Sequence, residues 1–490
     1  MKKTSRILQL VFIMLFFSSA LNAQVTLPPF FNCNMVLQQG IPIPVWGLAS
    51  PGEKVSVTFN EKTVTTKTGK DGKWKVTLQP MNYGGPYKMV VKGKNLRTIE
   101  NILIGEVWVC SGQSNMEFNL SSANNAEAEI AASDYPEIRL FTVKKRIAQT
   151  PQDMLEEGDW WECSPISSPK FSAVAYFFGR ALYQKLKVPI GLINTSWGGT
   201  VAETWTSTDA IEKNPDFVSK LENLKKMDNT EFANNLMKEG KDRLGPNSYP
   251  TLLYNGMINP LIPYAVKGAI WYQGEGNAGR AFQYRRVFSD MIKDWRSHWN
   301  QGDFPFLFVQ LANFMKADSL PVESTWAELR EAQTMALSLP KTGMASAIDV
   351  GDALNIHPKD KQTVGNRLAL SALNVAYRQP VENLGPVYRE MKVVGNTVEV
   401  TFDHVGQGLK AKDKYGYVKG FTVAGNDHKF HWAKAIITGT SNVLVTSAEV
   451  TVPVAVRYGW ANNPDDVNLY NSQYLPADPF RTDKWKGITE

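Results

Sequence analysis

The alternation of apolar and polar residues divides the 490-residue chain into three parts. In the first part, residues 24–100, short segments such as 54–60 and 73–78 alternate apolar and polar side chains. This alternation predicts β-strands with one face in solvent, and turns such as 69–72 separate them. We therefore expect an N-terminal β-sandwich-like domain over residues 24–100.

The pattern changes at residue 101, where apolar runs begin to alternate with long amphipathic segments. Strands are expected at 102–110, 190–194, 266–272, 304–311 and 344–350, and helices at 172–186, 280–299, 323–339 and 361–377. Alternating strands and helices favour a parallel sheet whose strands are joined by right-handed crossovers. Residues 101–380 are therefore predicted to form a three-layer α/β domain.

Two further segments depart from this alternation of strands and helices. Residues 208–250 are polar and charged with weak helical character, which is typical of a solvated helical excursion; a lid over a site is the alternative. Residues 381–490 return to short strands with glycine and asparagine turns, and they end in a stretch rich in proline and aromatic residues. We expect a C-terminal β-sandwich-like domain followed by an extended tail.

Residues 1–23 have the pattern of a cleavable signal peptide. Three cations precede the apolar run 7–17, and residues 21–23 fit a cleavage site. No other apolar run approaches the roughly 20 residues of a membrane span, so we expect a periplasmic or secreted mature chain without one. The formal net charge of +6 falls by three when this leader is removed, which gives no case for a nucleic-acid partner.

The most distinctive stretch is the apolar run 102–109, which ends at a Ser-Gly turn and is followed by Gln113, Ser114 and Asn115. A buried strand that ends here places a serine hydroxyl at the carboxyl edge of a sheet, where open α/β sheets bind ligands. Ser114 is therefore a candidate nucleophile. The alternative is that Ser114 caps the helix that follows.

A serine nucleophile needs a base, and the chain has five histidines. His357 stands alone between the predicted strand 344–350 and a predicted helix, so it should lie at the same sheet edge as Ser114. Pro358 fixes the backbone that follows and disfavours helix at His357. His357 is the candidate base, and a structural histidine is the alternative.

Two further loops that follow predicted strands carry candidate oxyanion donors. Gly198 and Gly199 follow the strand 190–194, and a glycine pair lets a backbone N–H approach a ligand closely. Asn277 follows the strand 266–272 and could donate its side-chain amide to the same oxygen. Either motif alone is weak, but three such loops at one sheet edge support each other.

These blocks resemble a known family. Gly-Gln-Ser-Asn-Met around Ser114, the glycine pair, Trp-Tyr-Gln-Gly-Glu with Asn277, and His357-Pro358 resemble the four blocks of the SGNH hydrolases. More narrowly they resemble the sialate O-acetylesterase family of carbohydrate esterases, over most of residues 24–486. The resemblance implies an SGNH-type α/β fold that uses neither a metal nor another cofactor.

The resemblance also implies roles for residues. Ser114 would be the nucleophile and would supply one oxyanion N–H, while His357 would act as general base and then as general acid. The other oxyanion donors would be the N–H of Gly199 or Gly198 and the amide of Asn277. Residues expected to brace these loops are Gln113, Gln273, Glu275 and Asn355.

One position departs from the family pattern. Many members carry an aspartate two residues before the histidine, and here that residue is Asn355, which cannot stabilise an imidazolium by charge. Asp352 is the favoured substitute because it is a loop carboxylate close to His357 in the chain. A backbone carbonyl could orient the ring instead, leaving a Ser-His dyad, or the enzyme could be impaired.

The reaction implied is removal of O-acetyl groups from sugars, most specifically from O-acetylated sialic acids. An acetyl esterase acting on plant polysaccharide such as acetylxylan is the alternative, because fold and motif do not fix the sugar. Asn355 also keeps open a non-catalytic carbohydrate-binding relative. A metal-dependent hydrolase is disfavoured because no His, Asp and Glu residues have ligand spacing.

Overall fold

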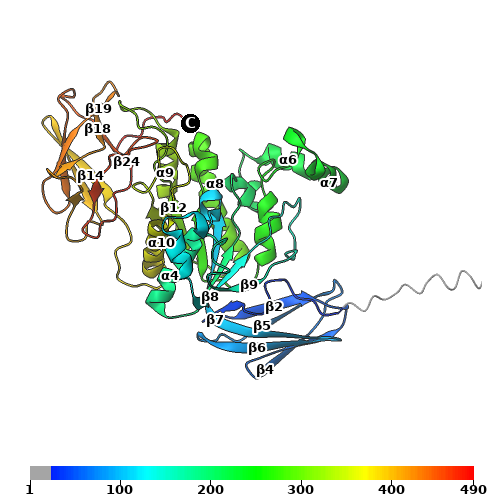
Figure 1. Cartoon of the computed structure of the whole chain (residues 1–490). Helices are drawn as coiled ribbons and strands as arrows, with labels where there is room; N and C mark the ends of the chain where they lie inside the picture. Colours follow the sequence, from blue (N-terminus) through cyan, green and yellow to red (C-terminus); the bar gives the residue numbers. More distant parts are fainter. Residues whose placement is uncertain (1–23) are drawn as a thin grey trace, which may run out of the picture.

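The computed structural model describes residues 24–490 of the chain (Figure 1). The predicted signal peptide, residues 1–23, lies outside the described residues. Among residues 24–490, no helix combines the length and the apolar character needed to cross a bilayer.

A mostly parallel central sheet organises the molecule. Its strand order is β13-β12-β11-β7-β10-β8-β9, and only the β8–β9 pair in this order is antiparallel. The strands are β7 (Leu96–Gly112), β8 (Tyr135–Thr142), β9 (Trp160–Cys163), β10 (Ile190–Asn194), β11 (Gly268–Tyr272), β12 (Phe306–Gln310) and β13 (Thr342–Ser346). The predicted α/β class and its five parallel strands are confirmed, whereas β8 and β9 were not predicted.

Helices cover both faces of this sheet. On one face α4 packs against α10, and on the other α8 packs against α9 (Figure 1). Trp108 of β7 meets Phe178 of α4 with 5.0 Å between ring centroids, and Trp271 of β11 stacks on Phe288 of α8 at 6.5 Å. The four predicted helices are confirmed as α4 (Ala173–Leu186), α8 (Ala281–Trp299), α9 (Thr325–Met335) and α10 (Lys361–Val375).

Strand β7 belongs to two parts of the molecule. Its first half pairs antiparallel with β6, and its second half pairs parallel with β10 and β11. The predicted boundary between residues 100 and 101 therefore falls inside one continuous strand. The other N-terminal strands are β1 (Val36–Gln38), β2 (Ile43–Leu48), β3 (Lys54–Phe59), β4 (Lys62–Lys67), β5 (Lys73–Leu78) and β6 (Gly84–Lys92).

The chain after α10 is again β-rich (Figure 1). One sheet has the order β14-β15-β21-β20-β17 and another the order β19-β18-β22-β24, with a further β16–β23 pair. Their bounds are β14 (Val387–Val394), β15 (Thr397–Asp403), β16 (Lys410–Ala411), β17 (Tyr417–Val418), β18 (Phe421–Ala424), β19 (Phe430–Trp432), β20 (Lys434–Ile437), β21 (Asn442–Thr446), β22 (Ala455–Tyr458), β23 (Leu469–Tyr470) and β24 (Phe480–Arg481).

The polar segment 208–250 forms the helices α5 (Thr208–Ile211), α6 (Val218–Lys226) and α7 (Asn229–Met237). Leu224 of α6 and Phe232 of α7 belong to a small apolar cluster separate from the main core. Figure 1 shows α6 and α7 projecting away from the central sheet. Two short helices precede α4, namely α2 (Ser114–Glu117) and α3 (Ala126–Ala131).

Candidate active site

Ser114 lies where β7 turns into the short helix α2. The turn depends on Gly112, whose φ is 135° and where an added Cβ would lie 2.1 Å from the carbonyl oxygen of Tyr272. The N–H of Gln113 donates to that same carbonyl oxygen at 2.9 Å. The adjacent strand β11 therefore fixes the turn, and the serine comes out at the carboxyl edge of the sheet.

His357 reaches Ser114 from the loop after β13. Its Nε2 lies 2.8 Å from Ser114 Oγ, which is the hydrogen-bond distance expected between a nucleophile and its base. The ring of His357 also stacks on Phe118, with 6.4 Å between centroids. Burial, and then the nearby cation of Lys361, lower the pKa of His357. Both effects favour the neutral imidazole, which is the form that can accept a proton.

Asp352, the carboxylate favoured from the sequence to orient His357, is engaged within its own loop. Its exposed carboxylate accepts the N–H of Leu354 at 2.8 Å, because the loop folds back on itself there. In the described part of the chain, Asp352 and His357 do not share a hydrogen bond or an ion pair. Asn355 serves the backbone, since its Oδ1 accepts the N–H of His357 at 2.9 Å. The ring of His357 is therefore held by other contacts.

The two glycines after β10 differ in their hydrogen bonds. The N–H of Gly198 donates to Glu117 Oε2 at 2.5 Å, so it is already engaged. Gly199 has a φ of 73°, and its carbonyl oxygen accepts from Asn247 Nδ2 at 2.7 Å. Within residues 24–490, the N–H of Gly199 has no protein acceptor. Of the pair, Gly199 is thus the one with an N–H available to a ligand.

Asn277 is buried and its amide is fixed on three sides. Its Oδ1 accepts the N–H of Ala202 at 3.0 Å and Gln273 Nε2 at 2.7 Å. Its Nδ2 donates to Glu203 Oε2 at 3.0 Å. These partners decide which side of the amide is nitrogen and leave one of its two N–H groups free for a ligand.

A buried polar network behind Ser114 joins three loops. Asn115 Nδ2 donates to Glu275 Oε1 at 2.6 Å and to the carbonyl oxygen of Ile356 at 3.0 Å. Asn115 Oδ1 accepts from Lys361 Nζ at 2.5 Å. Since Ile356 directly precedes His357, Asn115 ties the histidine loop to the turn that carries Ser114.

The two glutamines of the sequence blocks also bridge loops. Gln113 Oε1 accepts the N–H of Gly276 at 3.2 Å, and Gln273 Nε2 donates to the carbonyl oxygen of Thr200 at 3.1 Å. These contacts join the loop after β11 to the nucleophile turn and to the loop after β10. The loops that carry Ser114, Gly199 and Asn277 therefore form one connected unit.

Sequence reasoning missed Lys361, which lies wholly inside the protein. Its Nζ is 4.7 Å from the ring centroid of Phe118 and 5.5 Å from that of Tyr272. Burial lowers the pKa of Lys361 to about 7, and burial raises the pKa of the neighbouring Glu275. Lys361 starts a helix in a charged segment, so the sequence offered no sign that this lysine would be buried.

Glu117 was missed as well, although it lies three residues after Ser114. Its carboxylate accepts the N–H of Gly198 and also pairs with Lys145. The Lys145 ammonium in turn lies 5.4 Å from the ring centroid of Trp197. These contacts fix the start of the glycine loop, so the carboxylate has a positioning part in the site.

Together these groups supply a hydroxyl, a neutral base and separate N–H donors at one sheet edge, which are the components of acyl transfer. In the described part of the chain, no group of three or more His, Cys, Asp or Glu side chains could hold a metal ion. The site residues are instead engaged with one another through hydrogen bonds.

Comparison with known proteins gives consistent matches. The family model described as carbohydrate esterase, sialic acid-specific acetylesterase, matches residues 104–374. A sialate O-acetylesterase from Mus musculus is 32% identical over 496 residues, with 89% of this chain and 90% of the relative covered. The Homo sapiens sialate O-acetylesterase is 31% identical, covering 92% of this chain and 91% of its own. A crystal structure of a carbohydrate acetylesterase from Xanthomonas citri has a TM-score of 0.85 and 40% identity, covering 94% of this chain and 100% of that one.

Proposed function

Because this chain belongs to the sialic acid-specific acetylesterase family of carbohydrate esterases, we propose that it removes O-acetyl groups from sugars with Ser114 as nucleophile. The observation that carries this proposal is the 2.8 Å distance between Ser114 Oγ and His357 Nε2. We assign O-acetylated sialic acids as the first substrate class, because the relatives that match most of the chain are sialate O-acetylesterases.

In the first half of the reaction, His357 Nε2 takes the hydroxyl proton as Ser114 Oγ attacks the acetyl carbonyl carbon. The carbonyl oxygen becomes an oxyanion, which accepts hydrogen bonds from the backbone N–H groups of Ser114 and Gly199 and from the amide of Asn277. The bond to the sugar oxygen then breaks. His357 returns the proton to that oxygen, and the sugar leaves as an alcohol.

In the second half, water attacks the acetyl-enzyme. His357 accepts a proton from the water, and the same donors hold the second oxyanion. The bond between Ser114 Oγ and the acetyl carbon breaks, and Oγ recovers its proton from His357. Acetic acid, ionised at neutral pH, is the second product, and the enzyme returns to its starting state.

Since the Asp352 carboxylate is engaged with the N–H of Leu354, we propose that the base operates as a Ser-His dyad. The ring is positioned by stacking on Phe118 and by the Asn115 bridge to Ile356, not by a carboxylate. This arrangement explains how Asn355 can replace the usual acid without removing the base from the nucleophile.

A sialic acid also carries a carboxylate, for which a cation near the site is needed. Arg280 Nη2 lies 2.7 Å from Glu203 Oε1, and the other oxygen of Glu203 accepts from Asn277. The Arg280 side chain is 41% exposed, so it can still meet a ligand. We assign Arg280 as the group that faces the substrate carboxylate.

The test is acetate release from O-acetylated sialosides and from acetylated xylan, measured for the native chain, Ser114→Ala and Asn277→Ala. Loss of the nucleophile should lower kcat by more than about 10⁴, because the covalent route is removed. Loss of one oxyanion donor should cost about 10²–10³. Thermal melting of each variant provides the control for folding.

Three outcomes would overturn parts of this proposal. Equal small losses in both variants would reject Ser114 as nucleophile. No turnover of either substrate by well-folded native protein would favour a non-catalytic carbohydrate-binding role. Faster release from acetylated xylan than from any sialoside would replace the substrate class while leaving the mechanism in place.

A further inference from the structure

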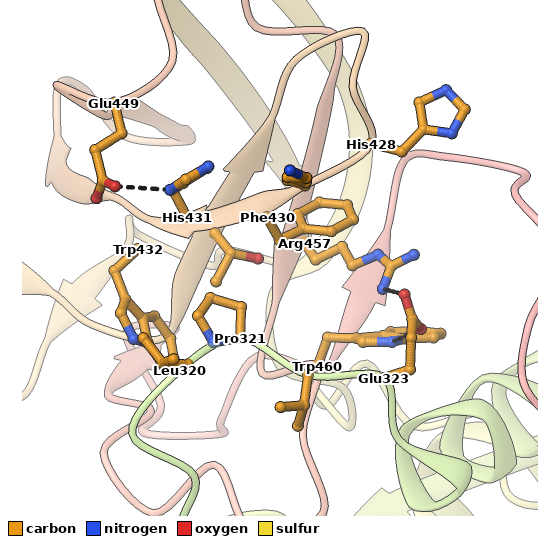
Figure 2. Close-up of a pocket in the computed structure, with 13 residues that line it drawn as sticks. Leu320, Pro321, Glu323, His428, Phe430, His431, Trp432, Glu449, Arg457 and Trp460 are labelled. Carbon is orange, nitrogen blue, oxygen red and sulfur yellow. Dashed lines mark hydrogen bonds and ion pairs between the residues drawn. The ribbon is translucent and has the colours of Figure 1, made fainter.

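A cleft of about 510 Å³ opens between the α/β part of the chain and the C-terminal β region (Figure 2). One wall is the segment 320–323, which lies between β12 and α9. The opposite wall is formed by β19, together with Arg457 of β22 and Trp460 beyond it. The lining residues include none of the groups around Ser114, so this cleft is distinct from the esterase site.

Hydrogen bonds hold the aromatic and polar side chains of the cleft in place. Trp432 Nε1 donates to the carbonyl oxygen of Ser319 at 2.9 Å, which joins β19 to the opposite wall. His431 Nδ1 lies 2.9 Å from the carboxylate of Glu449 (Figure 2). Trp432 nevertheless remains 44% exposed as a residue, so part of its ring can meet a ligand.

The inner surface is aromatic and its buried cation is neutralised. Arg457 is 3% exposed and lies 2.8 Å from both Glu323 Oε1 and Asp483 Oδ2. Its guanidinium lies 4.0 Å from the ring centroid of Phe430 and 5.0 Å from that of Trp460. The Arg457 guanidinium therefore holds the rings of Phe430 and Trp460 in place, and its own charge is already paired with Glu323 and Asp483.

The aromatic, imidazole and carboxylate groups that line the cleft suit one class of ligand. Aromatic rings pack against the C–H face of a pyranose, while imidazole and carboxylate groups bond its hydroxyls. The lining cations Lys429 and Arg457 are matched by Glu323 and Glu449, so the cleft offers no excess charge to an anion. Its volume falls within the range of about 300–1,000 Å³ that is typical of small-molecule sites.

We propose that this cleft binds a neutral oligosaccharide segment of the glycan, apart from the acetylated residue that Ser114 attacks. The site would hold the polymer to the enzyme while esters are removed elsewhere along the chain. The role given to the bound segment rests on the proposed function, whereas binding to the cleft can be measured without turnover and so tests this inference separately.

The test is calorimetric titration of the full chain with xylohexaose, with cellohexaose and, as an acidic comparator, with 3′-sialyllactose. We expect at least one neutral hexaose to bind saturably. Trp432→Ala should weaken that binding by about tenfold, because the exposed ring face is removed. Trp161→Ala is the matched control, since Trp161 is 59% exposed on β9 and should leave binding unchanged.

A second variant guards against local unfolding at Trp432. His431→Ala removes a hydrogen-bonding ring that is 30% exposed, and it should also weaken the hexaose. In each variant, kcat/KM for a small chromogenic acetyl ester should stay at the native value. The proposal fails if neither hexaose binds, if both variants bind like the native chain, or if only the sialoside binds. Loss of a dimer in Trp432→Ala without sugar binding would assign the cleft to a second copy of the chain instead.

Discussion

Lys361 acts on His357 in two ways that the geometry separates. Its Nζ bonds to Asn115 Oδ1, and Asn115 in turn holds the carbonyl of Ile356, so the lysine positions the histidine loop. Its cation also lowers the pKa of His357 through space. A structural role would affect stability and rate at every pH, whereas the electrostatic role changes the pH at which activity begins.

Lys361→Met should therefore shift the acid limb of the kcat/KM profile. Removing the cation leaves only burial to depress the pKa of His357, so that pKa rises toward its ordinary value of 6.5. The base must be neutral, so activity should begin at higher pH in the variant than in the native chain. The acid limb lies below the Lys361 pKa of about 7, where most of the native lysine is charged and its cation acts on His357.

The control is Lys361→Arg, which keeps the positive charge and should retain the native acid limb even if its rate is lower. Acetate release across pH, with melting temperatures for both variants, makes the measurement. An unchanged or downward-shifted limb in Lys361→Met would show that the lysine is only structural.

Among the elements, α8 is joined to the start of the 208–250 excursion through one buried carboxylate. Asp294 accepts the N–H and the hydroxyl of Ser207 at 2.7 and 2.6 Å, and Ser207 caps α5. The same carboxylate lies 3.0 Å from His298 Nδ1 one turn along α8. His298 also faces Asp209, at 3.8 Å, and the ring of Tyr254.

This arrangement predicts a pH-dependent contribution to stability. The hydrogen bond to Asp294 raises the pKa of His298 to about 9, above its ordinary value of 6.5. The stabilisation is therefore complete below about pH 6.5 and is lost as pH rises through 9. His298→Gln should lower the free energy of unfolding by about 1–2 kcal/mol at pH 6, after allowance for solvent screening of this half-buried ring. Urea titrations at pH 10 should show little difference in stability between the variant and the native chain. An equal loss of stability at pH 6 and pH 10 would show that the charge of His298 does not contribute.

The elements that position the site were readable from the sequence, but several contacts between them were not. Apolar runs followed by glycine and polar residues placed Ser114, Gly199, Asn277 and His357 on loops after parallel strands of one sheet. The role of Asp352 could not be judged from its proximity to His357 in the chain, because its carboxylate accepts the N–H of Leu354 within its own loop. Lys361 escaped notice because its partner Asn115 is 246 residues away.

The strands that were missed have a similar explanation. β8 contains a proline near its start and β9 has only four residues, so neither gives a long apolar run. β7 was seen only in its apolar second half, because its first half pairs with β6 and exposes polar residues. The strands β7, β8 and β9 are completed by pairing with other strands. A single sequence does not display such pairing.

At the scale of the whole molecule, the C-terminal β region supports the loop that carries His357. Asn463 Oδ1 accepts from Asn313 Nδ2 at 2.8 Å, and Asn313 Oδ1 accepts the N–H of Gly351 at 2.8 Å. The Tyr470 hydroxyl lies 3.2 Å from Asp349, which precedes the same loop. A substitution that disrupts the junction between the two regions should therefore disturb the position of His357.

Arg330 of α9 is the centre of that junction, because it is fully buried and spans both regions. Its guanidinium donates to Leu311 and Ala312 at the end of β12, and to Ala461 and Asn462 in the C-terminal region, all at 2.8–2.9 Å. Burial lowers the pKa of Arg330 to about 9, which still leaves the side chain charged at neutral pH.

Arg330→Met should lower the free energy of unfolding by more than about 3 kcal/mol, because four carbonyl groups, two buried and two half-buried, lose their donor at once. Arg389→Met, at a half-exposed arginine of β14, is the matched control and should change stability by less than about 0.5 kcal/mol. Urea unfolding followed by tryptophan fluorescence makes the comparison. Because the junction lies next to the histidine loop, Arg330→Met should also lose esterase activity at denaturant concentrations below its main unfolding transition, whereas the control should lose both together. Unfolding and inactivation that coincide in Arg330→Met would show that the C-terminal region does not selectively support the base.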